Sequence, residues 1–310
     1  MWNMEEKKIQ GFEQAVRVLP LRLRQEAMAL PADQRARVEE LRLRWGRPMA
    51  AVLPEGERPL GGEPVTGQEL EQLLELASRA SFHTVADQLR RGYLTVEGGH
   101  RVGLCGTAVV RDGELRGLRR LSSAAVRVAR QAVGAARPVS DRLLRREGTL
   151  YSTLILAPPG AGKTTLLRDL IRAASDGEGM TPHRVGVADE RSELAALWDG
   201  VPQLDVGRHT DVLEGCPKAE ALMMLLRGMN PQVLAVDEIT APADVAALEH
   251  AANCGVSLLA TAHGSGVEDL RRRPLYREML ERNIFQQLIL IRRNGSGRSY
   301  EVLPLGDGLC

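Results

Sequence analysis

The sequence predicts an α/β fold in residues 136–310, built on a mostly parallel sheet with helices on both faces, and a smaller α+β domain in residues 1–135. Two observations predict this division. After residue 140, short apolar runs alternate with helical patterns, which is typical of parallel strands buried on both faces. Earlier in the chain, several strand-like segments follow one another across glycine turns, which favours antiparallel pairing.

The first domain opens with residues 9–45, which read mainly as helix and are interrupted at Pro20 and near Pro31, where the proline ring removes a backbone donor. At the end of this segment, residues 38–45 alternate apolar and charged side chains. This alternation predicts a half-buried strand, and residues 49–53 predict a second strand beside it. A hairpin or meander is therefore expected at the start of the first sheet.

An amphipathic helix is predicted over residues 66–82, because Thr66 stands three residues before Glu69 and the two can cap the helix reciprocally. The rest of the domain is predicted from glycine turns and alternating patterns. In chain order we expect a helix near 85–91, a strand, a turn at Gly98-Gly99, a returning strand to about Val110, a turn at Asp112-Gly113 and a strand at 122–128.

The second domain is predicted from its regular alternation of strands and helices. We expect strands at 153–157, 184–188, 232–236 and 256–262, helices at 163–174, 217–228 and 242–253, and a terminal hairpin of residues 285–291 and 299–303. The carboxyl ends of the parallel strands then meet at one edge of the sheet, so we expect the functional residues to follow directly after each strand.

A phosphate-binding loop follows the first of these strands. Residues 157–164 read APPGAGKT, a phosphate-loop pattern with alanine in place of the first glycine. Small residues let backbone N–H groups approach a phosphate, and the helix that follows directs its positive end there. Lys163 supplies charge for the β- and γ-phosphates, and the Thr164 hydroxyl is expected to bind Mg²⁺. The nucleotide-binding candidates are Pro159, Gly160, Ala161, Gly162, Lys163, Thr164 and Thr165.

Two carboxylates end the apolar run at residues 233–236. Asp237 is expected to hold Mg²⁺, and Glu238 is expected to polarise the attacking water. An apolar strand that ends in acidic residues is common on its own. A separation of about 75 residues from the phosphate loop along the sequence favours a functional role for this one. Together with Lys163 and Thr164, these residues predict a site for ATP and Mg²⁺.

Two further strand ends carry candidate catalytic residues. Glu190 follows the strand at 184–188 and is a second candidate for orienting water, with helix capping by Asp189 or Ser192 as the structural alternative. His263 follows the strand at 256–262 and can contact the γ-phosphate or the water. A histidine that simply satisfies its hydrogen bonds at a strand end is the alternative there.

Composition limits the function classes. The net charge is +1 and aromatic residues make up 3%, so no stable nucleic-acid partner is expected. The four cysteines form no CxxC pair, and no apolar run reaches the roughly 18 residues of a membrane helix. These features predict a cytoplasmic protein with reduced thiols, and peripheral docking on a membrane complex remains compatible with them.

An arginine-rich border separates the two domains. Residues 111–147 contain ten arginines and four acidic residues, a net charge of +6. A solvated linker explains such a cluster as well as a functional role does. If one of these arginines reaches a nucleotide, within the chain or across a subunit interface, Arg127 and Arg130 are the first candidates.

The four strand-end motifs, in this order, resemble the type II/IV secretion ATPases. Asp189-Glu190 falls on the acidic box of that family, Glu238 on its Walker B glutamate and residues 261–263 on its histidine box. The chain departs from the family in two places, because Asp237 stands where a glycine is usual and Thr240 where an arginine is usual. The pumping mechanics of the family therefore do not carry over automatically.

A closer resemblance is to the stage III sporulation AA family. It rests on residues 92–103 (GYLTVEGGHRVG), 157–165, 189–193 (DERSE) and 211–219 (DVLEGCPKA) and covers about residues 30–305. The resemblance implies a cytoplasmic RecA-like P-loop ATPase of the mother cell, which energises a secretion-like complex in the membranes between mother cell and forespore. Lys163, Thr164, Asp237 and Glu238 then bind and hydrolyse ATP, with Glu190 and His263 in support.

We interpret the chain as a Mg²⁺-dependent motor ATPase that works as a homo-oligomeric ring, for which six subunits are expected, docked on that membrane complex. The sequence leaves two alternatives open. One is an ATPase stimulated by nucleic acid, which the near-neutral charge and scarce aromatics count against. The other is an assembly scaffold that binds ATP but hardly hydrolyses it.

Overall fold

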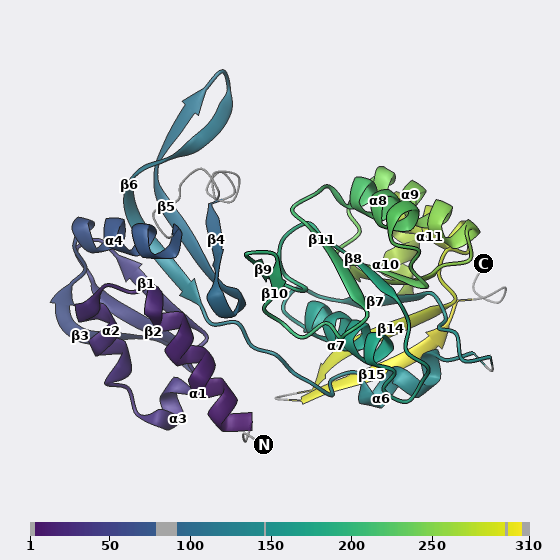
Figure 1. Cartoon of the computed structure of the whole chain (residues 1–310), viewed down its shortest axis with the longest axis horizontal. Helices are drawn as coiled ribbons and strands as arrows, with labels where there is room; N and C mark the ends of the chain where they lie inside the picture. The colour runs from purple at the N-terminus through teal and green to yellow at the C-terminus, as the bar shows by residue number, and fades with distance from the viewer. Residues whose placement is uncertain (1–3, 79–91, 146, 295–296, 306–310) are drawn as a thin grey trace. The chain divides into compact units, whose positions relative to one another are not determined.

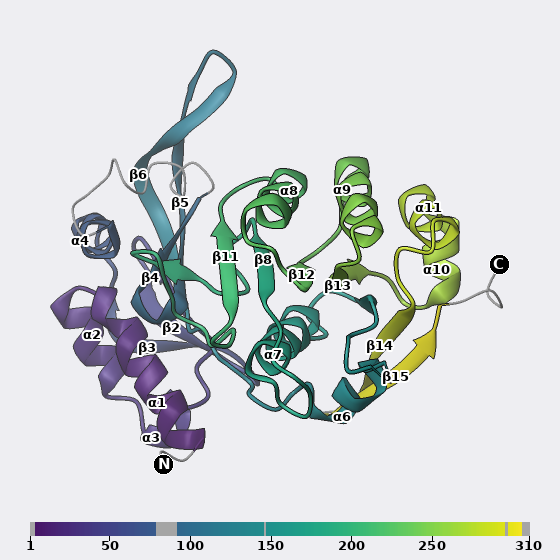
Figure 2. The ribbon, with the colours of Figure 1, turned by 45° about the vertical axis from the view of Figure 1, so that its right-hand side comes forward.

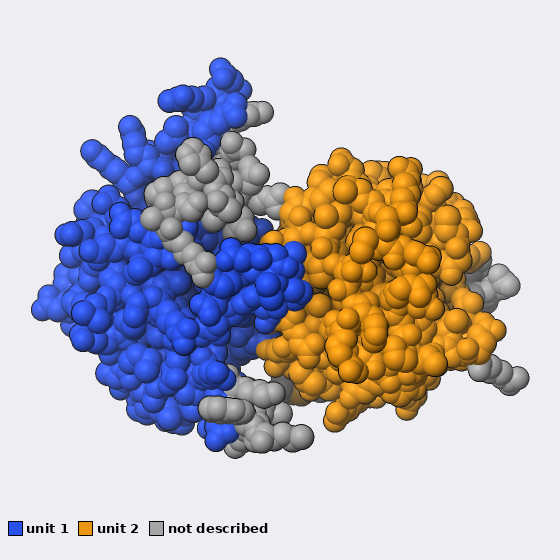
Figure 3. Space-filling model, viewed as in Figure 1, with its two compact units in different colours: residues 1–130, 196–203 blue, residues 131–195, 204–310 orange. Residues whose placement is uncertain are grey.

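The computed structural model describes residues 4–78, 92–145, 147–294 and 297–305. The chain divides into two compact units, shown in different colours in Figure 3. Unit 1 comprises residues 1–130 and 196–203, and unit 2 comprises residues 131–195 and 204–310. The sequence predicts one boundary, between residues 135 and 136, and contains no signal that a segment of the second half belongs with unit 1.

Unit 1 is built on an antiparallel sheet with the strand order β3-β2-β1-β6-β5-β4. Its strands are β1 (Glu40–Arg44), β2 (Pro48–Leu53), β3 (Gly56–Pro64), β4 (Tyr93–Val96), β5 (His100–Arg111) and β6 (Glu114–Arg127). β5 and β6 form a long hairpin that extends well beyond the other strands (Figures 1 and 2). β3 is missing from the sequence prediction because Leu60 is its one buried residue and its prolines and glycines resemble a loop, which an edge strand tolerates.

Helices pack against this sheet around one aliphatic core. They are α1 (Met4–Ala15), α2 (Leu21–Met28), α3 (Ala32–Arg35) and α4 (Gly67–Ser78), with short 3₁₀ turns η1 (Val16–Val18) and η2 (Glu97–Gly99). Phe12, Leu23 and Leu70 from the helices share a buried cluster with Leu41 and Val126 of the sheet. The segment 196–203 adds the small pair β9 (Leu197–Trp198) and β10 (Val201–Pro202), and Gln203 Oε1 accepts a hydrogen bond from the Gly98 amide at 2.8 Å.

The predicted cap of α4 is confirmed. The Thr66 amide donates to Glu69 Oε2 at 2.9 Å, and the Glu69 amide donates to Thr66 Oγ1 at 3.2 Å. These reciprocal bonds satisfy two backbone donors that would otherwise have no partner at the helix start. The predicted end of this helix at residue 82 and the predicted helix at 85–91 lie outside the described residues.

Unit 2 is an α/β domain on a seven-stranded sheet of order β11-β8-β12-β13-β7-β14-β15, in which all neighbours are parallel except the edge pair β14–β15. The strands are β7 (Thr153–Ala157), β8 (Val185–Asp189), β11 (Thr210–Glu214), β12 (Val233–Val236), β13 (Ser257–His263), β14 (Gln287–Asn294) and β15 (Gly297–Pro304). The mostly parallel sheet is the one that the sequence predicts. β11 is not predicted because it is a half-buried edge strand without an apolar run.

Helices cover both faces of this sheet, as Figure 2 shows, with α8, α9, α10 and α11 on one side and α7 on the other. The helices are α6 (Arg137–Ser140), α7 (Lys163–Asp176), α8 (Lys218–Gly228), α9 (Pro242–Asn253), α10 (Val267–Arg272) and α11 (Pro274–Glu281), with the 3₁₀ turn η3 (Asp141–Leu143). Because both faces are covered, β7 and β12 are buried along their whole length. The residues that follow these two strands are therefore anchored to the buried core of unit 2.

Candidate active site

A loop with two glycines joins β7 to α7 and leaves the start of that helix open. Gly160 and Gly162 have φ angles of 70° and 103°, values that other residues adopt only with strain. Gly162 precedes the first helical residue, and no side chain caps the helix at that position. The N–H groups of the first turn are consequently available to an anion, which the helix dipole also favours.

Lys163 begins α7 and is held by three acceptors. Its Nζ donates to the carbonyl oxygens of Ala157 and Pro158 at 3.1 and 3.2 Å, and it contacts His263 Nδ1 at 2.9 Å. Burial lowers the pKa of Lys163, and the carboxylates of Asp237 and Glu238 oppose that shift. The ammonium thus lies within the field of the two acidic residues predicted to accompany it.

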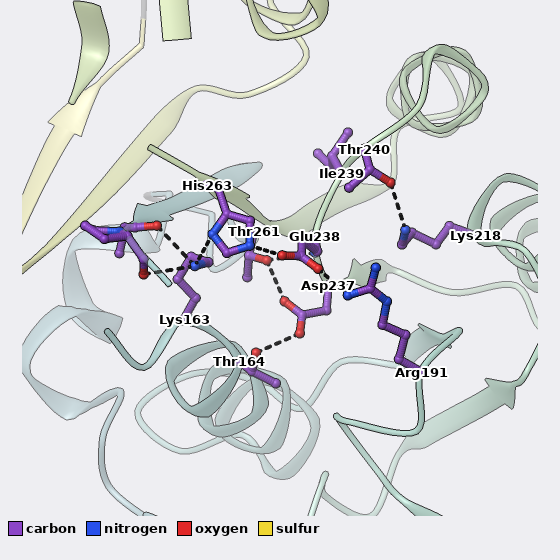
Figure 4. Close-up of polar contacts among 12 residues, drawn as sticks. Lys163, Thr164, Arg191, Lys218, Asp237, Glu238, Ile239, Thr240, Thr261 and His263 are labelled. Carbon is purple, nitrogen blue, oxygen red and sulfur yellow. Dashed lines mark hydrogen bonds and ion pairs between the residues drawn. The ribbon is translucent and has the colours of Figure 1, made fainter. Parts of the chain in front are cut away.

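His263 connects this lysine to Glu238. Lys163 can only donate, so His263 Nδ1 accepts, and the ring proton is placed on Nε2. Nε2 then donates to Glu238 Oε1 (Figure 4). His263 is therefore more than a histidine satisfied at a strand end, since it links the phosphate-loop cation to the carboxylate after β12.

Asp237 lies beside the hydroxyl of α7 that was expected to accompany it. Thr164 Oγ1 donates to Asp237 Oδ2 at 2.7 Å, and Thr261 Oγ1 donates to Asp237 Oδ1. The same Thr261 oxygen accepts the Glu238 amide at 2.8 Å. Glu238 has a φ of 58°, a left-handed conformation that is unusual outside glycine and is found preferentially at functional sites.

The end of β8 is arranged differently. The Asp189 carboxylate accepts the backbone amides of Glu193, Leu194 and Ala195 at 2.8 to 3.1 Å and so shapes the turn that follows. The helix that the capping alternative required is absent from residues 190–203 as the structure describes them. Asp189 nevertheless has the structural role that this alternative proposed, as a carboxylate that satisfies backbone donors.

Glu190 does not join the phosphate-loop residues. Its Oε2 lies 2.9 Å from Nζ of the buried Lys218, which also donates to Thr240 Oγ1 at 3.3 Å. The neighbouring Arg191 faces the site instead, with Nη1 at 2.7 Å from Glu238 Oε2 (Figure 4). Sequence reasoning missed Arg191, although it stands inside the DERSE motif.

A cavity of about 400 Å³ brings most of these residues together. Its lining is Pro159, Gly160, Gly162, Lys163, Thr164, Thr165, Arg191, Glu193, Asp237, Glu238, His263 and Arg298. Ala161 is a buried residue of the loop and is not part of the lining, and Glu190 is also outside it. Arg298 had no sequence signal, because it comes from the terminal hairpin far along the chain.

A larger hollow of about 680 Å³ lies where the parallel strands begin, lined among others by Ser152, Arg184, Gln232 and Ser257. Ligands of open α/β sheets bind at the opposite edge, beyond the carboxyl ends of the strands. The smaller cavity lies at that edge and contains the phosphate loop. We therefore place the candidate site there.

The two border arginines make their contacts inside unit 1. Arg130 donates to the carbonyl oxygens of Ala36 and Val38, and Arg127 lies 3.4 Å from Glu40. Among the described residues, no group of three acidic, histidine or cysteine side chains is suited to a metal ion. None of the described helices has the length and apolarity to cross a membrane.

Comparison with known proteins identifies the family of the chain. Residues 8–303 match the family described as "Sporulation stage III, protein AA". The chain belongs to this family. It is 39% identical over 288 residues to stage III sporulation protein AA of Bacillus subtilis (strain 168), which covers 90% of this chain and 91% of that protein.

The fold is also shared with solved ATPase structures. The ATPase DotB of Legionella pneumophila matches with a TM-score of 0.58 and 16% identity over 88% of this chain and 78% of its own. The pilus retraction motor PilT, solved with bound ADP, matches with a TM-score of 0.58 and 18% identity over 88% of this chain and 80% of its own. The predicted fold class and the predicted family resemblance are both confirmed.

Proposed function

We propose that the chain is a Mg²⁺-dependent P-loop ATPase that hydrolyses ATP to ADP and phosphate. The observation that carries the proposal is the convergence of Lys163 and Thr164, at the start of α7, with Asp237 and Glu238, at the end of β12, on one cavity. A nucleotide-binding loop alone would explain Lys163 and Thr164. The second pair adds the carboxylates that hydrolysis of the γ-phosphate requires.

The residues fit a magnesium ion. Thr164 Oγ1 and Asp237 Oδ2 lie 2.7 Å apart, and hydroxyl and carboxylate oxygens are ligands that Mg²⁺ prefers. The described residues supply too few ligands for a self-contained metal site, so the phosphates and water must complete it. When bound, Mg²⁺ would neutralise charge on the phosphate oxygens.

Glu238 is the best-placed residue to orient the attacking water. Oε1 accepts from His263 and Oε2 accepts from Arg191, which holds the carboxylate in place. Each oxygen keeps a further lone pair that can accept a proton from water. Water then forms a bond to the γ-phosphorus, the bond to the bridging oxygen breaks, and ADP and phosphate leave. Lys163 can exchange a neutral carbonyl acceptor for a charged phosphate oxygen, which is a stronger partner.

We further propose the cellular setting that the family implies. In this proposal the protein is cytoplasmic, forms a homo-oligomeric ring for which six subunits are expected, and energises the membrane-embedded sporulation complex from its cytoplasmic side. Membership of the sporulation family supports this setting, as does the shared fold with a protein described as a pilus retraction motor. If the site is completed between subunits, specific ATPase activity will rise with protein concentration.

A phosphate-release assay tests the function directly. The wild-type chain with ATP and Mg²⁺ should release phosphate, and Glu238→Gln should bind ATP but release little. Equal turnover by Glu238→Gln would contradict the assigned role. Stimulation by single-stranded DNA or RNA would favour a nucleic-acid motor, and ATP-dependent assembly with negligible turnover would favour a scaffold.

A further inference from the structure

We propose that Arg298 anchors the nucleotide on the side of the phosphate loop that is remote from the γ-phosphate, so that it strengthens the binding of ATP and ADP equally. This inference rests on the proposed function and adds to it a residue outside the motifs that suggested it. Four features of unit 2 carry it: the register of the terminal hairpin, the packing of Arg298 on Gly162, its lack of a competing partner, and the strand order.

The hairpin register places Arg298 at the level of the phosphate loop. β14 is parallel to β7 and pairs with it from Gln287↔Thr153 to Leu290↔Leu156. It then continues past the end of that pairing, and Arg293 pairs with Arg298 on β15. Three residues of strand correspond to about 10 Å, which is the distance needed to reach the loop that follows β7.

The guanidinium of Arg298 lies directly against Gly162. A Cβ atom added to this glycine would be 2.9 Å from Arg298 Cζ and 3.1 Å from Nε and Nη1. Any side chain at residue 162 would therefore displace the arginine as well as strain a backbone with a φ of 103°. Arg298 also lines the 400 Å³ cavity, so it faces the space that the loop encloses.

The guanidinium of Arg298 has no hydrogen-bond or ion-pair partner among the residues that the structure describes. The other arginine of the cavity, Arg191, is paired with Glu238. On the same hairpin, Arg292 is paired with Glu301 at 3.1 Å. An unpaired guanidinium beside N–H groups that already favour an anion increases the positive charge there, and its planar fork suits phosphate oxygens.

The strand order decides which part of the nucleotide Arg298 can meet. Asp237 and Glu238 follow β12 and His263 ends β13, and both strands lie on one side of β7 in the order β12-β13-β7-β14-β15. Arg298 comes from β15, on the other side. A γ-phosphate directed at the carboxylates and Lys163 leaves the α-phosphate and nucleoside for the side of Arg298. Both groups are present in ADP as well as ATP.

Binding and turnover of Arg298→Ala and Arg298→Lys test this assignment. We expect the Kd of Arg298→Ala to rise about tenfold for a non-hydrolysable ATP analogue and for ADP alike, as loss of one charge-assisted contact predicts. KM should rise with it, while kcat changes less than twofold, because uniform binding does not lower the chemical barrier. Arg298→Lys keeps the charge but loses the planar guanidinium, so its Kd values should rise less than those of Arg298→Ala.

Arg292→Ala is the matched control, since it removes an arginine of the same hairpin that is paired with Glu301 and does not line the cavity. It should leave both Kd values unchanged. Unchanged Kd values in Arg298→Ala would overturn the inference. So would a rise in Kd for the ATP analogue alone, or a fall in kcat alone, because either would indicate a contact with the γ-phosphate. Failure of the wild-type chain to bind either nucleotide would instead refute the proposed function itself.

Discussion

Two neighbouring strands of unit 2 each have an Asp-Glu pair at their carboxyl end, and the two pairs make different contacts. β8 ends at Asp189 and is followed by Glu190, and β12 is followed by Asp237 and Glu238. The two strands are parallel and in register, with Val236 opposite Ala188. The carboxylates therefore start from equivalent positions at one edge of the sheet, and their surroundings account for the difference between them.

After β12, the partners are side chains of the phosphate-loop site. Thr164 and Thr261 donate to Asp237, while His263 and Arg191 hold Glu238. After β8, the partners belong to the scaffold, because Asp189 binds three backbone amides and Glu190 pairs with the buried Lys218. We therefore propose that the contacts of the carboxylates distinguish a catalytic strand end from a structural one.

The largest expected effect is a difference in kcat between variants of Glu238 and Glu190. Glu238→Gln should lower kcat by about 10²–10⁴-fold and preserve ATP binding, because the amide cannot accept a proton from water. Glu190→Gln, the matched change at the other strand end, should leave kcat within about tenfold of the wild type, since Glu190 does not line the cavity. Phosphate release under saturating ATP measures both. Equal losses would mean that both strand ends act on the reaction.

Lys163→Ala should produce the next largest effect, on affinity. A charge-assisted contact contributes roughly 1.5–3 kcal/mol, so the Kd for ATP should rise by about 10- to 100-fold. The variant should fold, because the partners that Lys163 leaves behind include two loop carbonyl groups and His263, next to the open cavity. Titration with a fluorescent ATP analogue gives the Kd. Wild-type affinity for ATP in this variant would contradict the role of Lys163 in binding phosphate.

The two aspartates should separate by stability. Asp189→Asn should lower the free energy of unfolding by about 3 kcal/mol, because the buried carboxylate accepts three amides and an amide side chain directs N–H groups at some of them. Asp237→Asn should cost less stability and instead weaken the Mg²⁺ dependence of phosphate release. Urea unfolding and a magnesium titration measure the two effects. Equal losses of stability would contradict the division of roles.

The sequence predicted the parts of the fold that local pattern determines. The apolar runs of β7 and β12 and the capping box of Thr66 and Glu69 are local signals, and the structure contains each of them. The edge strands β3 and β11 were missed because a strand paired on one side needs little apolar sequence. Segment 196–203 was missed because its place in unit 1 depends on contacts distant in sequence.

In the candidate site too, the residues that follow from strand pattern were predictable, and those that depend on contacts distant in sequence were not. Lys163, Thr164, Asp237 and Glu238 could be grouped because parallel strands bring their carboxyl ends to one edge. Whether Glu190 or Arg191 faces the cavity depends on the turn that Asp189 organises, which the strand pattern does not specify. Arg298 depends on the register of a terminal hairpin with the first strand of the sheet, and no local motif encodes that register.

The smallest expected effect concerns the pair at the end of β8. Among the described residues, Glu190→Gln leaves the buried Lys218 with Thr240 as its remaining side-chain partner, so the free energy of unfolding should fall by about 1 kcal/mol. Lys218→Met in the same chain removes the ammonium that was left without a charge partner. The double variant should therefore be more stable than Glu190→Gln alone, as a coupled pair requires. Additive losses in urea unfolding would instead show that the two residues act independently.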